Sequence, residues 1–274
     1  MLEPRLVRTH PAKLQKNSRA TELDAPPAPS ELDVLEVFLA HGPEIGLADL
    51  AMLLDLNKGT VTRLLVRLEY RGYLYRSANG KYRLGFRVFE LGNHFQNQLE
   101  IRRAALPELA SLVEQTEQAA FLCVRDRDCA LCVERIEGRH RAHIYALHIG
   151  ERQPLHCGAA PRALLSGLSD SEILAYASRT GLPAFTPRTI STPKGVLEDA
   201  HLTRSQGYVV SNEDVSPGIG AIGAPVRDFT RHVVASISVS GIAASYTPER
   251  ISVLGNAVQA AAQRVSQEMG FPGR

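Results

Sequence analysis

Residues 57–84 read NKGTVTRLLVRLEYRGYLYRSANGKYRL, and their pattern specifies the structure of the N-terminal part of the chain. Its first half repeats apolar residues at the i, i+3, i+4 and i+7 spacing of one helix face: Val61, Leu64, Leu65 and Leu68. Asn57 is a good N-cap for this helix, and Gly72 ends it. The second half has short alternating runs on either side of Asn79-Gly80, a dipeptide that strongly favours a tight hairpin. The stretch therefore predicts a helix followed at once by a β-hairpin.

The preceding residues predict two more helices. Ser30 can cap the first, whose apolar residues recur at helical spacing: Leu32, Val34, Leu35, Phe38 and Leu39. The sequence HGP at 41–43 ends it, and a short helix follows from Leu47 to Leu54. Three helices and a hairpin within about sixty residues form a winged helix-turn-helix, a DNA-binding fold. We assign this domain to residues 30–92.

Charge is unevenly distributed along this domain. Residues 58–87 hold eight basic residues and one acidic residue, whereas residues 31–55 hold six acidic residues and no Lys or Arg. Five side chains that fall away from the apolar face of the third helix can enter the major groove of DNA: Lys58, Thr60, Thr62, Arg63 and Arg67. The hairpin, or wing, adds three candidates for contact with the DNA backbone or minor groove: Arg76, Lys81 and Arg83. An ordinary solvated face is the alternative, but the basic helix, the hairpin and the acidic segment together favour binding of double-stranded DNA.

The composition of the 274-residue chain is that of a soluble globular protein of two domains, with 44% hydrophobic and 22% charged residues. The longest run without Asp, Glu, Lys or Arg, from His232 to Pro248, is shorter than the roughly 20 apolar residues of a membrane helix. Residues 1–29 lack hydrophobic periodicity and a secretory apolar core, so we expect a mobile tail. Four cysteines are too few for a disulfide scaffold, and we expect a cytoplasmic protein with no membrane partner.

The rest of the chain predicts a second domain that mixes helices and strands. We expect a linker helix over residues 93–106 and a domain over 107–272 whose first helix opens at Pro107. Strand patterns occupy residues 119–126, 129–136, 140–149, 207–213, 218–228 and 232–242. Helix patterns begin at Pro161, at Ser169, near Lys194 and at Pro248. Because strands and helices do not alternate strictly, the pattern predicts an α+β domain with a mainly antiparallel sheet.

Three features of this second domain are compatible with a ligand pocket. Ser236, Ser238 and Ser240 alternate along one strand and share one face, although a simple polar outer face gives the same pattern. Small residues precede Pro161, where free amides at a helix start attract an anion, although a tight turn also needs small residues. The segment PGIGAIGAP at 217–225 offers flexible backbone, and its usual form is an irregular loop that enters a strand.

Four motifs in order along the chain resemble the IclR family of bacterial transcriptional regulators. They are the winged helix-turn-helix run 31–92, GERQPLHCGAAPRALL at 150–165, GYVVSNEDVSPGIGAIGAPV at 207–226 and ASISVSG at 235–241. The resemblance implies a winged helix-turn-helix joined through a linker helix to a GAF-like α+β effector-binding domain. It also implies homodimers or tetramers that bind operator DNA under the control of a small organic acid.

The resemblance also implies which residues form the effector site. It places the acid at the turn before the helix of Pro161, at the loop after Gly207-Tyr208 and at two serines. The corresponding positions are Ala159, Ala160, Ser211, Ala221, Ser238 and Ser240. Some members of the family have an acidic residue where Ser211 stands and a cysteine where Ala221 stands. Because this chain lacks that carboxylate and thiol, we hypothesise an aromatic or larger, less hydrated acid as the effector.

Other chemistry finds less support in the sequence. Cys129-x-x-Cys132, with His140 and His143 downstream, resembles zinc spacing or a thiol redox pair, but the chain has no second cysteine pair of that spacing. Adjacent residues of a strand point to opposite faces, so His156 is not placed to serve Cys157 as a base. A ligand-binding domain that turns its ligand over remains an alternative. In the absence of a nucleotide-binding glycine fingerprint or a catalytic carboxylate pair, we expect a regulator without cofactor or metal rather than an enzyme.

The predicted linker region also carries apolar residues: Phe86, Phe89, Leu91, Phe95 and Leu99. They could pack a dimer or pack within one chain. One winged helix contacts only a short stretch of DNA, so a dimer would place two basic helices about one DNA turn, or a multiple of it, apart.

Overall fold

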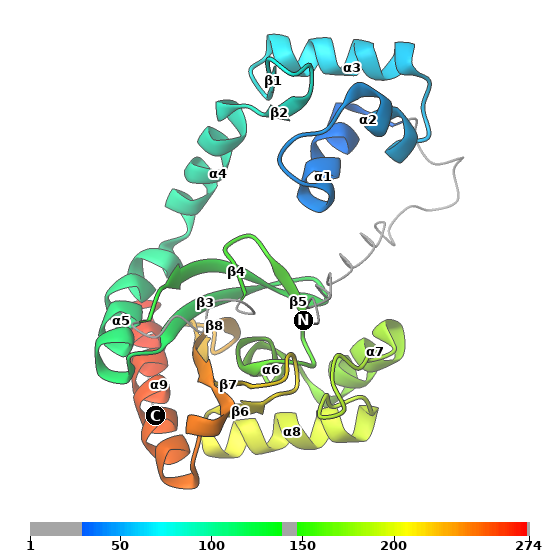
Figure 1. The fold of residues 1–274 in the computed structure, drawn as a ribbon. Helices are drawn as coiled ribbons and strands as arrows, with labels where there is room; N and C mark the ends of the chain where they lie inside the picture. Colours follow the sequence, from blue (N-terminus) through cyan, green and yellow to red (C-terminus); the bar gives the residue numbers. More distant parts are fainter. Residues whose placement is uncertain (1–28, 139–146, 273–274) are drawn as a thin grey trace, which may run out of the picture. The chain divides into compact units, whose positions relative to one another are not determined.

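The computed structural model describes residues 29–138 and 147–272 of the chain, so nearly all of the predicted tail and most of the predicted strand 140–149 lie outside the described residues. The chain divides into two compact units between Phe95 and Gln96. Figure 1 labels the helices and strands of both units.

The first unit is the predicted winged helix-turn-helix. Its helices are α1 (Glu31–His41), α2 (Leu47–Leu53) and α3 (Lys58–Tyr70), and its wing is the antiparallel pair β1 (Leu74–Arg76) and β2 (Tyr82–Leu84). Ile45 pairs with Tyr82 and so ties the segment before α2 to the wing. The core of the unit consists of apolar residues from all three helices and the wing, among them Val34, Leu50 and Leu65, which are fully buried.

Local sequence explains where these helices begin. Ser30 and Asp33 form a reciprocal capping box at the start of α1, and the Asn57 side chain accepts a hydrogen bond of 2.9 Å from the Thr60 amide at the start of α3. Each side chain satisfies an amide that has no partner within the helix. At the end of the wing, a Cβ on Gly85 would lie 2.1 Å from the Gly72 carbonyl oxygen, so only glycine fits there.

Two helices follow the wing: α4 (Phe86–Gln98), in which no side chain is buried, and α5 (Glu100–Thr116). The prediction that a helix opens at Pro107 is wrong, because Pro107 lies inside α5 and the break falls at Leu99. Proline disfavours a helix interior, but α5 buries Ile101, Ala105 and Leu109 along one face on both sides of the proline. Tertiary packing of that face outweighs the local preference.

The second unit has a six-stranded sheet in the order β5-β4-β3-β8-β7-β6, and neighbouring strands are antiparallel throughout. The strands are β3 (Ala119–Asp126), β4 (Cys129–Ile136), β5 (Arg152–Pro154), β6 (Val209–Asn212), β7 (Ile219–Arg227) and β8 (Val233–Ile242). The predicted α+β class with a mainly antiparallel sheet is confirmed. The short edge strand β5 was not predicted, since three residues carry no detectable alternation.

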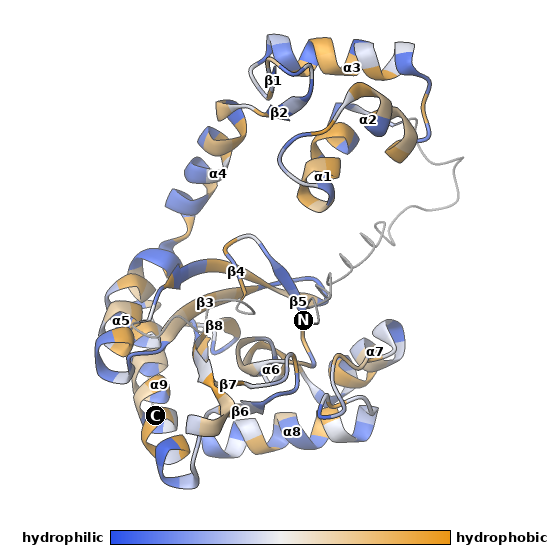
Figure 2. Cartoon of the chain, in the orientation of Figure 1, coloured by the Kyte–Doolittle hydropathy of each residue, from blue (hydrophilic) through white to orange (hydrophobic). Residues whose placement is uncertain are grey.

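Helices cover both faces of this sheet (Figure 1). On one face α5 packs with the C-terminal helix α9 (Pro248–Glu268) around residues such as Leu122, Ile222 and Ile237. On the other face lie α6 (Ala159–Leu165), α7 (Asp170–Thr180) and α8 (Pro193–Gln206). Figure 2 shows hydrophobic and hydrophilic residues together on α8 and α9, as helices with one buried face require.

The helices also differ in one boundary from the prediction. The helix predicted to open at Pro161 begins two residues earlier, at Ala159. Within residues 29–138 and 147–272, none of the helices combines the length and the apolar content that crossing a bilayer requires.

Candidate DNA interface and effector site

The helix α3 has one buried face and one exposed face. Its apolar side chains Val61, Leu64, Leu65 and Leu68 are buried in the core of the first unit, as the sequence predicted. The exposed face carries Lys58, Arg63 and Arg67. It also carries Val66, 57% exposed, and Tyr70, 90% exposed, which the sequence analysis did not select. The exposure of both residues could have been predicted from the sequence, because positions 66 and 70 fall outside the buried i, i+3, i+4 series.

The predicted DNA-contact residues of α3 differ in the contacts that they make within the protein. Within the part of the chain that the structure describes, Lys58 and Arg63 form no ion pair. Thr62 donates its hydroxyl hydrogen to the Lys58 carbonyl at 2.7 Å, and Thr60 is half-buried beside the Asn57 cap. The threonine hydroxyl oxygen can still accept a hydrogen bond, and its methyl group can contact a thymine methyl.

Arg67 is paired but exposed. Its Nη1 lies 2.9 Å from Glu31 Oε1, and the hydrogen bond from Arg67 lowers the pKa of the Glu31 carboxyl. The Arg67 side chain is 71% exposed in spite of this contact. An ion pair so open to water is weak, so Arg67 can exchange the carboxylate for a phosphate.

The wing is organised around one carboxylate that the sequence analysis did not select. Glu44 accepts hydrogen bonds from Ser77, Asn79 and Arg83, and its pKa is lowered, first by the Asn79 contact and then by Arg83. Arg83 is therefore held against Glu44, whereas Lys81 is exposed at the tip. The Arg76 guanidinium lies 5.8 Å from the centre of the Tyr82 ring, and its Nε donates to the Gly80 carbonyl.

In the second unit, the strands bring four of the six predicted effector residues together. Ser240 of β8 pairs with Ala221 of β7, which in turn pairs with Ser211 of β6. Ser238 pairs with Gly223 on one side and with Phe121 of β3 on the other. The result is one patch of small and hydroxyl-bearing residues on the sheet face that α6 covers.

The remaining two predicted residues, Ala159 and Ala160, lie against this patch at the start of α6. The Ser236 hydroxyl donates to the Ala160 carbonyl at 2.9 Å, and a Cβ on Gly223 would lie 2.8 Å from the Ala159 carbonyl carbon. Ser236 is fully buried and Ser238 is 4% exposed, so the strand does not present a simple polar outer face. All six positions therefore share one side of the sheet.

The start of α6 already has an anion, supplied by the protein. The Asp214 carboxylate accepts hydrogen bonds from the Gly158 amide at 3.0 Å, from the Ser211 hydroxyl and from Arg162. Arg162 also pairs with Asp199, and its side chain is only 8% exposed. Neither Asp199 nor Asp214 was predicted from the sequence. These carboxylates neutralise a buried arginine beside the predicted effector residues.

His156 and Cys157 are both buried and have different partners. The two ring nitrogens of His156 lie 2.8 Å from the Tyr176 hydroxyl and 3.0 Å from the Pro183 carbonyl oxygen, and burial lowers the pKa of the imidazole. The Cys157 thiol donates to the Pro154 carbonyl, and burial raises its pKa. Thus His156 does not serve Cys157 as a base, and the buried thiol is not activated as a nucleophile.

The other cysteines lie on neighbouring strands of the sheet. Cys132 is buried opposite Cys123 on the neighbouring strand, and Cys129 is half-buried. Among the residues that the structure describes, no group of three His, Cys, Asp or Glu side chains could hold a metal ion. His140 and His143, part of the suspected zinc pattern, lie outside the described residues.

The fold and the exposed basic helix define a two-unit protein of the winged helix-turn-helix class with an α+β second unit. The sequence model described as the IclR helix-turn-helix domain matches residues 32–78. The model described as the bacterial transcriptional regulator IclR C-terminal domain matches residues 93–267. The chain therefore belongs to the IclR family of bacterial transcriptional regulators, which confirms the resemblance found in the sequence.

Individual relatives cover most of the chain. The HTH-type transcriptional regulator KipR of Bacillus subtilis is 36% identical over 87% of this chain and 94% of its own length. XynR, an HTH-type transcriptional regulator of Escherichia coli, is 29% identical over 88% of this chain and 96% of its own. Among solved structures, the transcriptional regulator RHA06195 of Rhodococcus sp. RHA1 superposes with a TM-score of 0.79 at 27% identity, covering 88% of this chain and 96% of that one.

Proposed function

We propose that this protein is a transcriptional regulator whose affinity for operator DNA is controlled by a small organic acid bound beside α6. DNA binding is supported by the two faces of α3: its apolar face is fully packed in the core, and its cationic face is exposed. A helix of this kind next to a wing presents side chains to the major groove, while the wing follows the backbone.

Lys58 and Arg63 are the proposed first contacts with DNA, because they lose the least free energy when they leave their present surroundings. Because neither has an ion-pair partner among the described residues, each can approach a phosphate or a guanine without giving up a carboxylate. Arg67 and Arg83 must first release Glu31 and Glu44. The two groups of cations therefore differ in the free energy that DNA binding can gain from them.

The test uses the full chain and a duplex that the wild-type protein selects from a random pool. The double variant Lys58→Ala/Arg63→Ala should lose at least tenfold in affinity, measured by fluorescence anisotropy across a series of salt concentrations. Each lost phosphate contact should also lower the slope of log affinity against log salt by about 0.9. Unchanged affinity and slope would show that α3 is not the DNA-contacting helix.

The effector part of the proposal is supported by the patch around Ser238 and Ser240. Hydroxyl groups can donate to a carboxylate, and Phe121, next to Ser238 across the sheet, offers an aromatic contact. A structure of an IclR homologue from Microbacterium hydrocarbonoxydans, similar to this chain in fold at 22% identity and a TM-score of 0.79, is complexed with 4-hydroxybenzoate. An aromatic acid is therefore our proposed class of effector.

A comparison of acids on the full chain tests this assignment. 4-Hydroxybenzoate should bind in calorimetric titration and change operator affinity, whereas pyruvate and glyoxylate should bind more weakly. Ser238→Ala should leave operator affinity unchanged without ligand and weaken the response to acid. Tight binding of glyoxylate or pyruvate alone contradicts the aromatic preference, and chemical conversion of the acid during the titration would reveal an enzyme instead of a sensor.

We further propose a homodimer formed through α4. Phe86, Phe89, Leu91 and Phe95 are each at least half exposed, and α4 buries none of its own side chains. Large apolar side chains that are this exposed favour contact with a second protein surface. Sedimentation analysis of Phe86→Ser/Phe89→Ser should show dissociation, while a variant of the exposed Phe229, in the second unit, should sediment like the wild type.

A further inference from the structure

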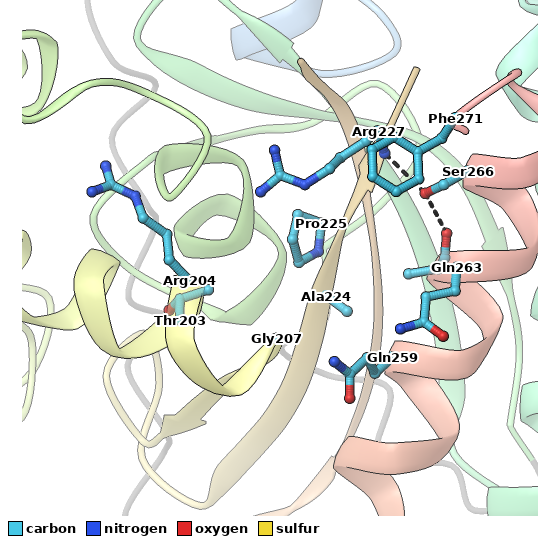
Figure 3. A pocket seen from close by; sticks show the side chains of 11 residues that line it. Thr203, Arg204, Gly207, Ala224, Pro225, Arg227, Gln259, Gln263, Ser266 and Phe271 are labelled. Carbon is cyan, nitrogen blue, oxygen red and sulfur yellow. Dashed lines mark hydrogen bonds between the residues drawn. The ribbon is translucent and has the colours of Figure 1, made fainter. Parts of the chain in front are cut away.

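The strand β7 extends beyond its neighbour β6 at the edge of the sheet. β6 pairs with residues 220–223 of β7, so the following residues, Ala224 to Arg227, have no strand on that side. The end of α8 and the last turns of α9 flank this free edge and line an open pocket of about 190 Å³ (Figure 3). Its lining includes Thr203, Arg204, Pro225, Arg227, Gln259 and Phe271.

Arg227 is a half-buried cation at this pocket. Its Nη1 donates to the Arg231 carbonyl at 3.0 Å, and within the described chain it forms no ion pair. Burial, and then the charge of Arg204, lower the pKa of the Arg227 guanidinium. In Figure 3 the Arg227 side chain extends past Pro225 toward Arg204. A cation in this setting gains free energy from an anion that enters the pocket.

Arg204 does not need such a partner. It pairs with Asp170 at 2.7 Å and also donates to the carbonyls of Ser166 and Leu168. It therefore adds positive potential to the pocket while each of its three nitrogens already donates a hydrogen bond. This leaves Arg227 as the group that can bind a planar oxyanion through two parallel hydrogen bonds.

The other groups at the edge exclude an added β-strand. The Arg227 amide donates to the Ser266 hydroxyl at 2.9 Å, and Pro225 has no amide hydrogen, so the edge lacks two of the donors that a strand would need. The apolar surface at the pocket comes from Pro225, Ala224 and Phe271. An engineered cavity of roughly 150 Å³ binds benzene, so a pocket of this size accommodates one ring with a carboxylate.

We propose that this pocket is a second ligand site of the α+β unit, which binds a small monocarboxylate with a flat apolar body. The carboxylate pairs with Arg227, and the apolar body lies against Pro225 and Phe271. The pocket shares no residue with the proposed effector patch, so the two sites can be occupied independently. The assignment does not require the effector proposal to hold.

Equilibrium dialysis of the full chain against radiolabelled benzoate tests the site. Arg227→Gln should weaken one binding event at least tenfold, and Arg227→Lys should give an intermediate loss because lysine keeps the charge but lacks the planar fork. Arg231→Gln, which removes an exposed arginine four residues away, is the matched control and should bind like the wild type. Urea unfolding of each variant verifies that it is folded.

The double variant Ser238→Ala/Ser240→Ala separates this site from the effector patch. Benzoate binding that depends on Arg227 and survives in the double variant supports the pocket, even if the effector patch binds nothing. Benzoate binding that is the same in the wild type and Arg227→Gln overturns the proposal. Binding of inorganic phosphate through Arg227 without any binding of benzoate overturns the assignment to a carboxylate.

Discussion

The arginines of α3 and α6 occupy opposite physical environments. Arg63 is exposed and has no ion-pair partner among the described residues, whereas the Arg162 side chain is only 8% exposed and is held between Asp199 and Asp214. The first can meet a phosphate at little cost in desolvation. The second is already neutralised inside the protein. Availability for a ligand is thus decided by neighbours in space rather than by the helix that carries the cation.

The two environments also differ in what a substitution removes. A change at Arg63 removes a group that contributes to DNA binding in the proposed interface but little to folding. A change at Arg162 leaves two carboxylates in a buried site without their cation, and such unpaired charges are expensive. We therefore expect a change at Arg162 to lower the free energy of unfolding and a change at Arg63 to lower the affinity for DNA.

The largest expected effect is on stability, from Arg162→Met. Removal of one partner of a buried ion pair costs about 3–5 kcal/mol of the free energy of unfolding. Urea denaturation monitored by circular dichroism measures the loss. The triple variant Arg162→Met/Asp199→Asn/Asp214→Asn removes the unpaired charges as well and should recover part of it. A single variant as stable as the wild type would show that the ion pairs form too weakly to matter.

The next effect is on DNA binding and separates Arg63 from Arg67. We expect Arg63→Ala to cost about 1–3 kcal/mol of binding free energy, and Arg67→Ala to cost less, because Arg67 gives up its pair with Glu31 when it binds DNA. Anisotropy titrations of both variants at the same salt concentration give the ranking. A larger loss for Arg67 would reverse the comparison and place Arg67 at the centre of the interface.

A smaller, pH-dependent effect is expected at His156. Burial lowers its pKa in the folded protein, so the unfolded chain binds a proton at higher pH than the folded chain does. The contribution of His156 is therefore complete above about pH 6.5 and is lost as the pH falls toward the lowered folded value, by at most about 1.4 kcal/mol per pH unit. The unfolding free energy of His156→Gln should fall less between pH 7.5 and 5.5 than that of the wild type. Equal slopes would contradict a neutral buried imidazole.

Much of the fold could be predicted because its signals are local. The Asn57 cap and the apolar series from Val61 to Leu68 place α3, and Asn79-Gly80 places the wing. Pro107 misled the prediction, because the packing of α5 on the sheet outweighs the helix-breaking tendency of one proline. Resemblance to the family, rather than periodicity, selected the small residues beside α6.

The ion pairs of both units could not be predicted. Arg162 lies 37 residues from Asp199 and 52 from Asp214, and Glu44 lies 39 residues before Arg83. A single sequence contains no signal that joins such distant charges, because their contact depends on how the strands and helices pack. The pocket at Arg227 was missed for the same reason, since β7, α8 and α9 meet there only in the folded chain.

The smallest expected effect concerns the exposed ion pair between Glu31 and Arg67. Glu31→Gln removes the carboxylate that Arg67 contacts at 2.9 Å, so it frees a cation on the proposed DNA-contacting helix without leaving a buried charge. We expect no measurable change in the midpoint of urea unfolding and a modest gain in affinity for the selected duplex, because Arg67 no longer exchanges one anion for another. Glu36→Gln, five residues along on α1, removes the same charge from an exposed residue that forms no ion pair with the described part of the chain, and it serves as the control for net charge. If both variants gain equally, the effect comes from overall charge and not from the release of Arg67.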